Sequence, residues 1–150
     1  MSTFTRTTGS KFDIIMEMEG RNLDKENFSV WKRIYSIEPH NATWHEFILA
    51  DENDDIIGKI RTLESPPGSG SCWIESLTVD PAFKRRGWGS KLLEIAVENA
   101  RNQGYRCING ELEPDDCSTV EELIQFYKKN GFTITKKEDV FHPVIEKILD

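Results

Sequence analysis

The sequence lacks the features that mark secreted, membrane-spanning and zinc-binding proteins. It contains three cysteines, which form neither a CxxC pair nor a Cys/His cluster with zinc spacing. No apolar run approaches the ~18 residues that a transmembrane helix needs. Residues 1–11 are polar, so we expect no signal peptide. These absences predict a cytoplasmic protein with reduced thiols, no metal and no membrane association.

Basic residues are scarce outside one short segment. The chain has 26 acidic and 19 basic residues and a formal net charge of −7. Four of the basic residues, Lys84, Arg85, Arg86 and Lys91, lie close together, and the rest of the chain is strongly acidic. A general basic surface is absent, which argues against a nucleic-acid partner. The basic segment instead suggests a local site for an anionic ligand.

The length and composition predict one domain over residues 1–150. The chain is 37% hydrophobic and 30% charged, which is enough apolar material for a core. No internal repeat or long linker divides it. Residues 1–10 are expected to form a loose tail or a short edge element.

Apolar periodicity and turn residues predict an α/β fold. The expected strands are 12–18, 43–50, 56–63, 72–79, 105–112, 132–135 and 144–149. The expected helices are 23–37, 90–103 and one that begins near Thr119, where Ser118–Glu121 has the form of a capping box.

The connections between these elements predict a sheet of mixed direction. A polar turn joins 43–50 to 56–63, so these strands should form an antiparallel hairpin. A helix separates 72–79 from 105–112, which favours a parallel pair with a right-handed crossover.

The most informative segment is 79–93, which joins a strand to an amphipathic helix through a basic loop. Gly87 and Gly89 allow the backbone to approach a ligand closely. The start of the helix offers unpaired N–H groups and the positive end of the helix dipole. The segment predicts a phosphate site, and a plain strand-to-helix turn is the alternative.

Two common phosphate motifs do not fit this segment. A P-loop requires lysine directly after its last glycine, and Ser90 separates Gly89 from Lys91. A dinucleotide fingerprint requires GxGxxG, and position 92 is leucine.

Two other motifs resemble the GNAT superfamily of N-acetyltransferases. The segment Lys84–Gly89, KRRGWG, resembles its Q/R-x-x-G-x-G/A motif, with lysine in place of Gln or Arg. The segment Phe126–Phe132, FYKKNGF, resembles its helix-end motif, in which a tyrosine precedes Gly-Phe. The motifs occur in the family's order, and the resemblance is strong over roughly residues 72–135.

The resemblance implies a GNAT-like fold and acetyl-CoA as the donor, with no metal. The sheet would be mixed but mostly antiparallel, with flanking helices, and the parallel strands 72–79 and 105–112 would splay apart. The pantetheine arm would run along Leu77, Thr78 and Val79. The pyrophosphate would lie at the loop and helix start, formed by Lys84, Arg85, Arg86, Gly87, Trp88, Gly89, Ser90 and Lys91. The Trp88 side chain is expected to be a packing or rim residue.

The resemblance also implies a catalytic acid. Tyr127 matches the family's tyrosine that protonates the departing CoA thiolate. A phenol suits this step because its pKa of about 10 lies above that of a thiol, about 8.5. The alternative is a core tyrosine on the inner side of its helix.

Three carboxylates are candidates for the base that deprotonates the amine. Glu75 is expected on one face of its strand with Leu77 and Val79, and Glu111 and Glu113 on one face of the next strand. Any of them can act directly or through a water. Each fits a solvated or ion-paired role equally well.

We therefore expect an N-acetyltransferase that moves acetyl from acetyl-CoA to a primary amine by direct attack in a ternary complex. The alternative is a catalytically degenerate acyl-CoA-binding regulatory module. The acceptor would be a small-molecule or protein amine, and the acidic composition favours a cationic one. A homodimer through exposed edge strands stays open.

Overall fold

The computed structural model of the chain describes residues 5–8, 13–18, 28–37, 42–84, 86–114, 118–135 and 142–149. In chain order its elements are β1 (Thr5–Thr8), β2 (Asp13–Met18), β3 (Ser29–Ile37), β4 (Ala42–Ala50), β5 (Ile56–Glu64), β6 (Ser71–Val79), the 3-10 turn η1 (Pro81–Phe83), α1 (Trp88–Asn102), β7 (Cys107–Glu111), α2 (Val120–Lys129), β8 (Thr133–Thr135) and β9 (Val144–Ile148).

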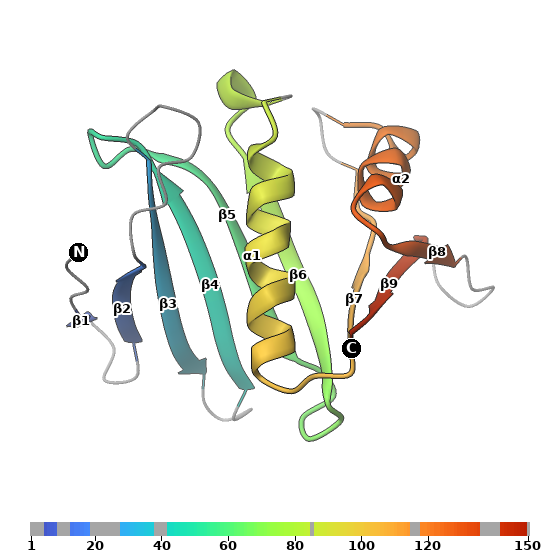
Figure 1. Cartoon of the computed structure of the whole chain (residues 1–150), viewed down its shortest axis with the longest axis horizontal. Coiled ribbons are helices and arrows are strands. Elements are labelled where there is room, and N and C mark those ends of the chain that lie inside the picture. Colours follow the sequence, from blue (N-terminus) through green and yellow to red (C-terminus); the bar gives the residue numbers. More distant parts are fainter. Residues whose placement is uncertain are drawn as a thin grey trace.

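The strands form one sheet in the order β1-β2-β3-β4-β5-β6-β7-β9-β8 (Figure 1). The β6–β7 pair is parallel, and the other neighbouring pairs are antiparallel. The predicted mixed sheet, the hairpin of β4 and β5, and the parallel pair around α1 are all confirmed. The predicted edge element at the start of the chain is β1, which pairs with β2.

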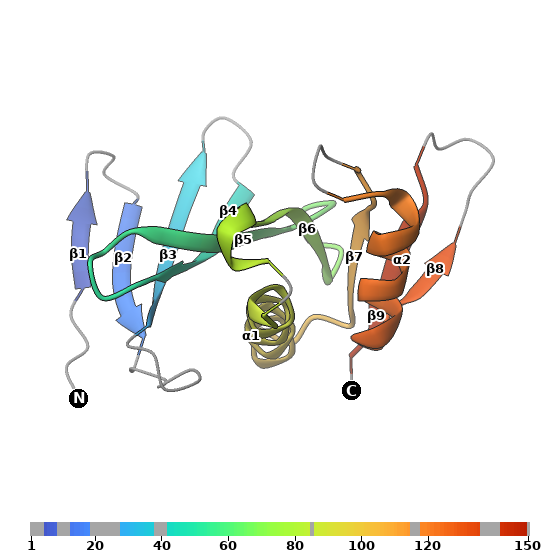
Figure 2. The same cartoon turned by 90° about the horizontal axis from the view of Figure 1, so that it is seen from above.

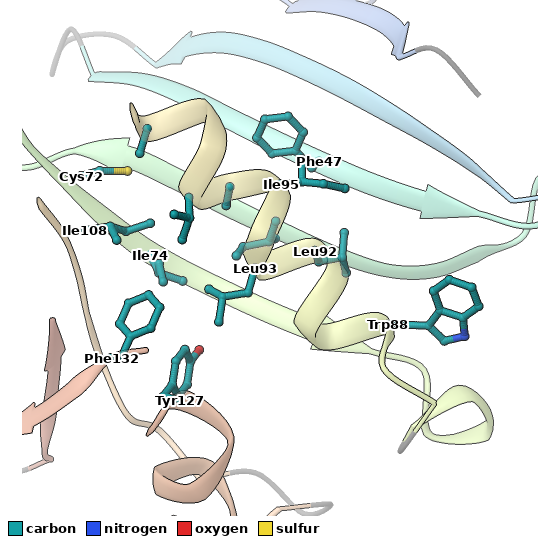
Figure 3. Close-up of a cluster of buried hydrophobic side chains, with 14 of the residues drawn as sticks. Phe47, Cys72, Ile74, Trp88, Leu92, Leu93, Ile95, Ile108, Tyr127 and Phe132 are labelled. Carbon is teal, nitrogen blue, oxygen red and sulfur yellow. The ribbon is translucent and has the colours of Figure 1, made fainter. Parts of the chain in front are cut away.

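Both α-helices pack on one face of the sheet, called here the helix face (Figure 2). The predicted apolar stripe of α1 is buried there: Leu92, Leu93, Ala96, Val97 and Ala100. Fully burying a leucine stabilises a fold by about 1.5–3 kcal/mol, so this stripe fixes α1 on β4–β7. Tyr127 of α2 joins the same cluster (Figure 3).

The capping box of α2 is confirmed, shifted by one residue. Thr119 is the N-cap: its hydroxyl accepts from the Glu122 backbone N–H at 3.2 Å, and the Glu122 carboxylate accepts from the Thr119 N–H at 3.3 Å. The first α2 residue is therefore Val120, one residue later than the predicted start near Thr119.

The predicted helix over 23–37 is wrong in its described part, because residues 29–37 form strand β3. Its apolar spacing was misleading, since both faces of β3 carry large side chains. Val30 is 2% exposed on the helix face, and Lys32 on that face donates to Asn99 of α1 at 2.9 Å. Trp31 and Arg33 alternate onto the opposite face. Residues 23–27 lie outside the described residues.

The face opposite the helices is called here the open face, because no described helix covers it. It carries Arg33 and Tyr35 of β3, Trp44 and Glu46 of β4, and Arg61 of β5. Tyr35 and Trp44 stack with ring centroids 6.1 Å apart and an interplanar angle of 5°. Arg33 lies over the Tyr35 ring and Arg61 over the Trp44 ring, at 4.5 and 5.2 Å.

Candidate functional site

The predicted phosphate loop ends in an exposed helix start. Gly87 is the N-cap of α1 and has φ 87°, a left-handed conformation that favours glycine. The Lys91 N–H donates to the Gly87 carbonyl at 3.1 Å, which closes the first helical turn. The N–H groups before Lys91 therefore have no partner within the helix and point out of its end. Such an end binds anions through these N–H groups and the helix dipole.

Basic side chains surround this helix end as the sequence predicted. Arg86 and Lys91 are exposed and Lys84 is half-buried. Arg86 lies over the Phe83 ring at 5.4 Å, and Lys91 lies 3.7 Å from the Glu94 carboxylate. Arg85 lies outside the described residues.

The Trp88 side chain is a packing residue. It is 4% exposed, and its ring lies 4.5 Å from the Phe28 ring at an interplanar angle of 66°. Its buried Nε1 has no hydrogen-bond partner among the described residues. What Trp88 offers a ligand is therefore its backbone N–H in the first turn of α1.

The parallel pairing of β6 and β7 stops midway along β6. The last pair is Ile74 with Gly110, and β6 continues to Val79. The ribbons of the two strands diverge beyond this pair, as predicted (Figure 1), and the space between their unpaired ends is called here the gap. The predicted pantetheine residues, Leu77, Thr78 and Val79, lie on this separated part of β6. It leads directly into η1 and the loop before α1.

Glu75 lies at a β-bulge beside the gap. Ile74 pairs with Thr62 and Ser76 pairs with Arg61, so Glu75 is the extra residue on β6. The bulge changes which residues face the helices: Ile74 does so before it, and Leu77 packs on the core after it. The expectation that Glu75 shares a face with Leu77 and Val79 is therefore wrong. Glu75 is exposed on the open face.

An arginine that the sequence analysis missed binds Glu75. Arg61 Nε and Nη2 lie 2.9 and 2.8 Å from Glu75 Oε2. Arg61 Nη1 lies 3.3 Å from the Tyr35 hydroxyl, and its guanidinium lies over Trp44. Burial lowers the pKa of Arg61, but the hydrogen bonds and electrostatic attraction of Glu75 and Tyr35 together outweigh this effect and raise the pKa above its usual value. Alternation along β5 places Arg61 on the open face, but only the bulge brings Glu75 to it.

Glu111 lies across the gap from Glu75. Ile74 of β6 and Gly110 of β7 are the last paired residues, and Glu75 and Glu111 directly follow them. Glu111 ends β7 and alternates with Gly110, which packs against Ile145 on the helix face, so Glu111 points to the open face. Glu113 lies beyond the end of β7 and is exposed, so the predicted alternation does not apply to it.

Tyr127 lies on the helix face in the same core cluster as Ile74, the residue before Glu75. It is 7% exposed, and burial raises the pKa of its hydroxyl to about 12. Its ring packs edge-on against Phe126 and Phe132, and its hydroxyl points toward Leu93 and Ile74 (Figure 3). The hydroxyl has no hydrogen bond to a described residue. The candidate acid and the candidate bases therefore lie on opposite faces of the sheet, near the point where β6 and β7 separate.

The described residues contain no group of three or more His, Cys, Asp or Glu residues arranged to hold a metal ion. No helix among them is both long and apolar enough to cross a membrane.

An exposed helix start with unpaired N–H groups and basic side chains lies beside the separated β6–β7 pair, an α/β arrangement in keeping with the two GNAT-like motifs. The family model of the acetyltransferase (GNAT) domain matches residues 43–134. The chain therefore belongs to the GNAT acetyltransferase family. A search of curated proteins gave no match.

Solved structures share this fold. A Klebsiella pneumoniae protein described as an acyl-CoA N-acyltransferase has a TM-score of 0.61 at 18% identity, over 71% of this chain and 73% of that one. A GNAT-family acetyltransferase from Staphylococcus aureus has a TM-score of 0.57 at 19% identity, over 71% and 69%. Ard1 from Thermoplasma volcanium has a TM-score of 0.57 at 25% identity, over 70% of each chain.

Proposed function

We propose that the protein transfers an acetyl group from acetyl-CoA to a primary amine by direct attack in a ternary complex. The observation that carries this proposal is the position of Tyr127 and Glu75 on opposite faces of the sheet at one gap. An amine that arrives from the open face and a thioester that enters the gap would meet between an acid and a base.

The donor site is proposed from main-chain groups. The separated part of β6, Leu77–Val79, has no β7 partner in the pairing register and can pair with the amides of a pantetheine arm. The pyrophosphate would bind the first-turn N–H groups of α1 and the basic side chains of Lys84, Arg86 and Lys91. Because main-chain groups and several basic side chains share the binding, glycines and positive charge in segment 79–93 matter more for this site than the identity of one particular side chain.

Proton transfer follows from the chemistry of the two reactants. A primary ammonium must lose a proton before its nitrogen attacks the thioester carbonyl, and we assign this step to Glu75, directly or through water. The C–S bond then breaks and the thiolate takes the Tyr127 proton. The second amine proton returns to the Tyr127 oxygen through solvent. One proton thus ends on CoA and one in the medium.

The high pKa of Tyr127 is compatible with this role. A phenol with a pKa of about 12 stays protonated at neutral pH and is a weak acid toward an aqueous thiolate. Burial disfavours a thiolate in the same way, because it penalises the charged form of any acid. The Cys72 thiol in the same core is an example, since burial raises its pKa to about 11. A CoA thiolate shielded from water at the gap would therefore be a stronger base toward Tyr127 than a thiolate in water.

Glu75 is favoured as the base over Glu111 by its hydrogen bonds. Arg61 occupies only Oε2 of Glu75, and no described residue donates to Oε1. One oxygen is thus fixed and the other is available to accept a proton. Glu111 flanks the same gap and is the alternative base.

The acceptor is proposed to be a small-molecule or protein amine that approaches the open face. Glu75 and Glu111 are carboxylates of this face beside the gap, and Glu146 of β9 lies on the same face, so together they favour a cationic acceptor.

The test is thiol release in a panel of amines with acetyl-CoA as donor. Polyamines, aminoglycosides, lysine derivatives and peptides with free N-termini should include an amine that releases CoA with stoichiometric acetylation. A protein that binds acetyl-CoA but releases thiol with no amine class would instead be a degenerate acyl-CoA-binding regulatory module. A protein that binds no acyl-CoA would refute both.

A further inference from the structure

The adjoining ends of α1 and α2 are linked by Asn130, the residue after α2. Its side-chain Nδ2 lies 2.8 Å from the Phe126 carbonyl and 3.2 Å from the Ser90 hydroxyl. A carbonyl oxygen only accepts, so the bond to Phe126 fixes the amide with its nitrogen toward Ser90. Both amide protons of Asn130 are thereby used, one within α2 and one across to α1.

The surroundings hold Asn130 in place. Its backbone N–H donates to the Tyr127 carbonyl at 3.1 Å, and its own carbonyl accepts from Lys147 Nζ at 3.1 Å. The helices approach closely beside it, because a Cβ on Gly89 would lie 3.4 Å from the Phe126 ring. The Asn130 amide is therefore fixed relative to both the first turn of α1 and the last turn of α2.

This bond determines how Ser90 can act. A serine hydroxyl has one proton and two lone pairs, and Asn130 donates into one lone pair. The Ser90 proton therefore points away from Asn130 and is available to a ligand. A hydroxyl that accepts one hydrogen bond is also a stronger donor in the next. Ser90 lies in the first turn of α1, beside the N–H groups that precede Lys91.

We propose that Asn130 is a positioning residue for acyl-CoA. It orients the Ser90 hydroxyl toward the coenzyme pyrophosphate, and it links the phosphate site to the helix turn that carries Tyr127. The inference rests on the proposed function, since it takes the start of α1 as the phosphate site. Asn130 acts through Ser90 and needs no contact of its own with the ligand.

The test is a double-mutant cycle on CoA affinity. Calorimetry would give the Kd for CoA of the wild type, Ser90→Ala, Asn130→Ala and the double variant. A hydrogen bond to a charged group predicts a Kd about tenfold higher in each single variant. The double variant should bind no more weakly than either single variant, because Asn130 acts through the Ser90 hydroxyl.

A purely structural Asn130 gives a different result. In that case Asn130→Ala weakens binding by the same factor with and without the Ser90 hydroxyl, and the proposal is wrong. It is equally wrong if Asn130→Ala leaves the Kd unchanged. Thermal unfolding of each variant checks the fold. If Asn130→Ala does not fold, the isosteric Asn130→Asp replaces it in the cycle, since a carboxylate removes both donors and would draw the Ser90 proton toward itself.

The outcome also separates this inference from the proposed function. A wild type that binds no CoA refutes the proposed donor. A wild type that binds CoA with additive variant effects refutes only the role of Asn130.

Discussion

Arg61 and Glu75 form a two-point contact at the bulge of β6: Nε and Nη2 of the arginine lie 2.9 and 2.8 Å from the same carboxylate oxygen. The pair is partly exposed, so its own contribution to stability is small. Its effect is geometric. It orients a carboxylate at the point where β6 and β7 separate, with one oxygen left for another donor.

Replacement of Glu75 should therefore impair catalysis with little effect on folding. We expect Glu75→Gln to lower kcat about 10²-fold near neutral pH, a typical loss for a missing general base. The loss should shrink at high pH, where the amine deprotonates without help. Rate profiles from pH 6 to 10 measure this.

Glu111→Gln is the matched control for Glu75, since both residues flank the gap on the open face. A pH-dependent loss in Glu111→Gln and none in Glu75→Gln would assign the base to Glu111. A loss in Glu75→Gln that is equal at every pH would exclude a role in deprotonation.

Tyr127→Phe should separate catalysis from stability. The hydroxyl makes no hydrogen bond to a described residue, so the variant should keep its free energy of unfolding within about 0.5 kcal/mol. We expect kcat to fall about 10²-fold because the thiolate loses its proton donor. Urea unfolding and steady-state kinetics on the same preparations test both parts.

The pKa of Tyr127 adds a condition to this prediction. Because burial raises that pKa to about 12, the phenol stays protonated below this value. The wild-type kcat should therefore show no decrease from tyrosine ionisation between pH 7 and 10. Full kcat in Tyr127→Phe would show that Tyr127 is only a core residue.

Local chemistry made the strand–loop–helix unit predictable. Gly87 precedes α1 and Gly89 lies in its first turn, and the stripe from Leu92 to Ala100 has an unambiguous helical period. The start of α2 was predictable to within one residue for the same reason: the predicted cap was Ser118 with Glu121, and the observed cap is Thr119 with Glu122, one residue further along. In such elements, the residues whose interactions define the first and last positions lie close together in the sequence.

The features that the sequence did not predict, namely strand β3, the bulge at Glu75 and two long-range contacts, depend on tertiary contacts. Val30 and Ile34 fit a helix or a strand equally well, and the choice depends on neighbours β2 and β4. The bulge at Glu75 depends on the register between β5 and β6, which no local pattern specifies. The contacts of Arg61 with Glu75 and of Asn130 with Ser90 join residues distant in sequence and follow only from the fold.

The backbone at Gly87 should be sensitive to any Cβ. Its φ is +87°, and a Cβ there would meet nothing within 4 Å, so the cost of substitution is conformational and not steric. We expect Gly87→Ala to destabilise the fold by about 1–2 kcal/mol and to weaken CoA binding. Gly87→Asn should cost less, because asparagine tolerates the left-handed region. Equal losses in both variants, measured by urea unfolding and calorimetry, would contradict a conformational cause.

His45 should make the free energy of unfolding depend on pH, with lower stability in acid. It is 7% exposed on the helix face, and its buried Nδ1 has no partner among the described residues. Burial, and then the charge of Lys32, lower its pKa from 6.5 to about 4. The unfolded chain therefore binds more protons than the folded one between these values. The stability from neutral His45 is complete above pH 6.5 and is lost as pH falls through about 4.

The size of this loss can be isolated by substitution. A pKa lowered from 6.5 to about 4 corresponds to roughly 3 kcal/mol of unfolding free energy between pH 7 and pH 4. His45→Leu removes the titrating group, so its unfolding free energy should decrease less over that range than that of the wild type. Urea unfolding of both proteins at pH 7, 6, 5 and 4.5 gives the difference, in which the carboxylates common to both cancel. Parallel curves would show that His45 is not the group that makes folding acid-sensitive, and that its proton uptake is the same in the folded and unfolded chain.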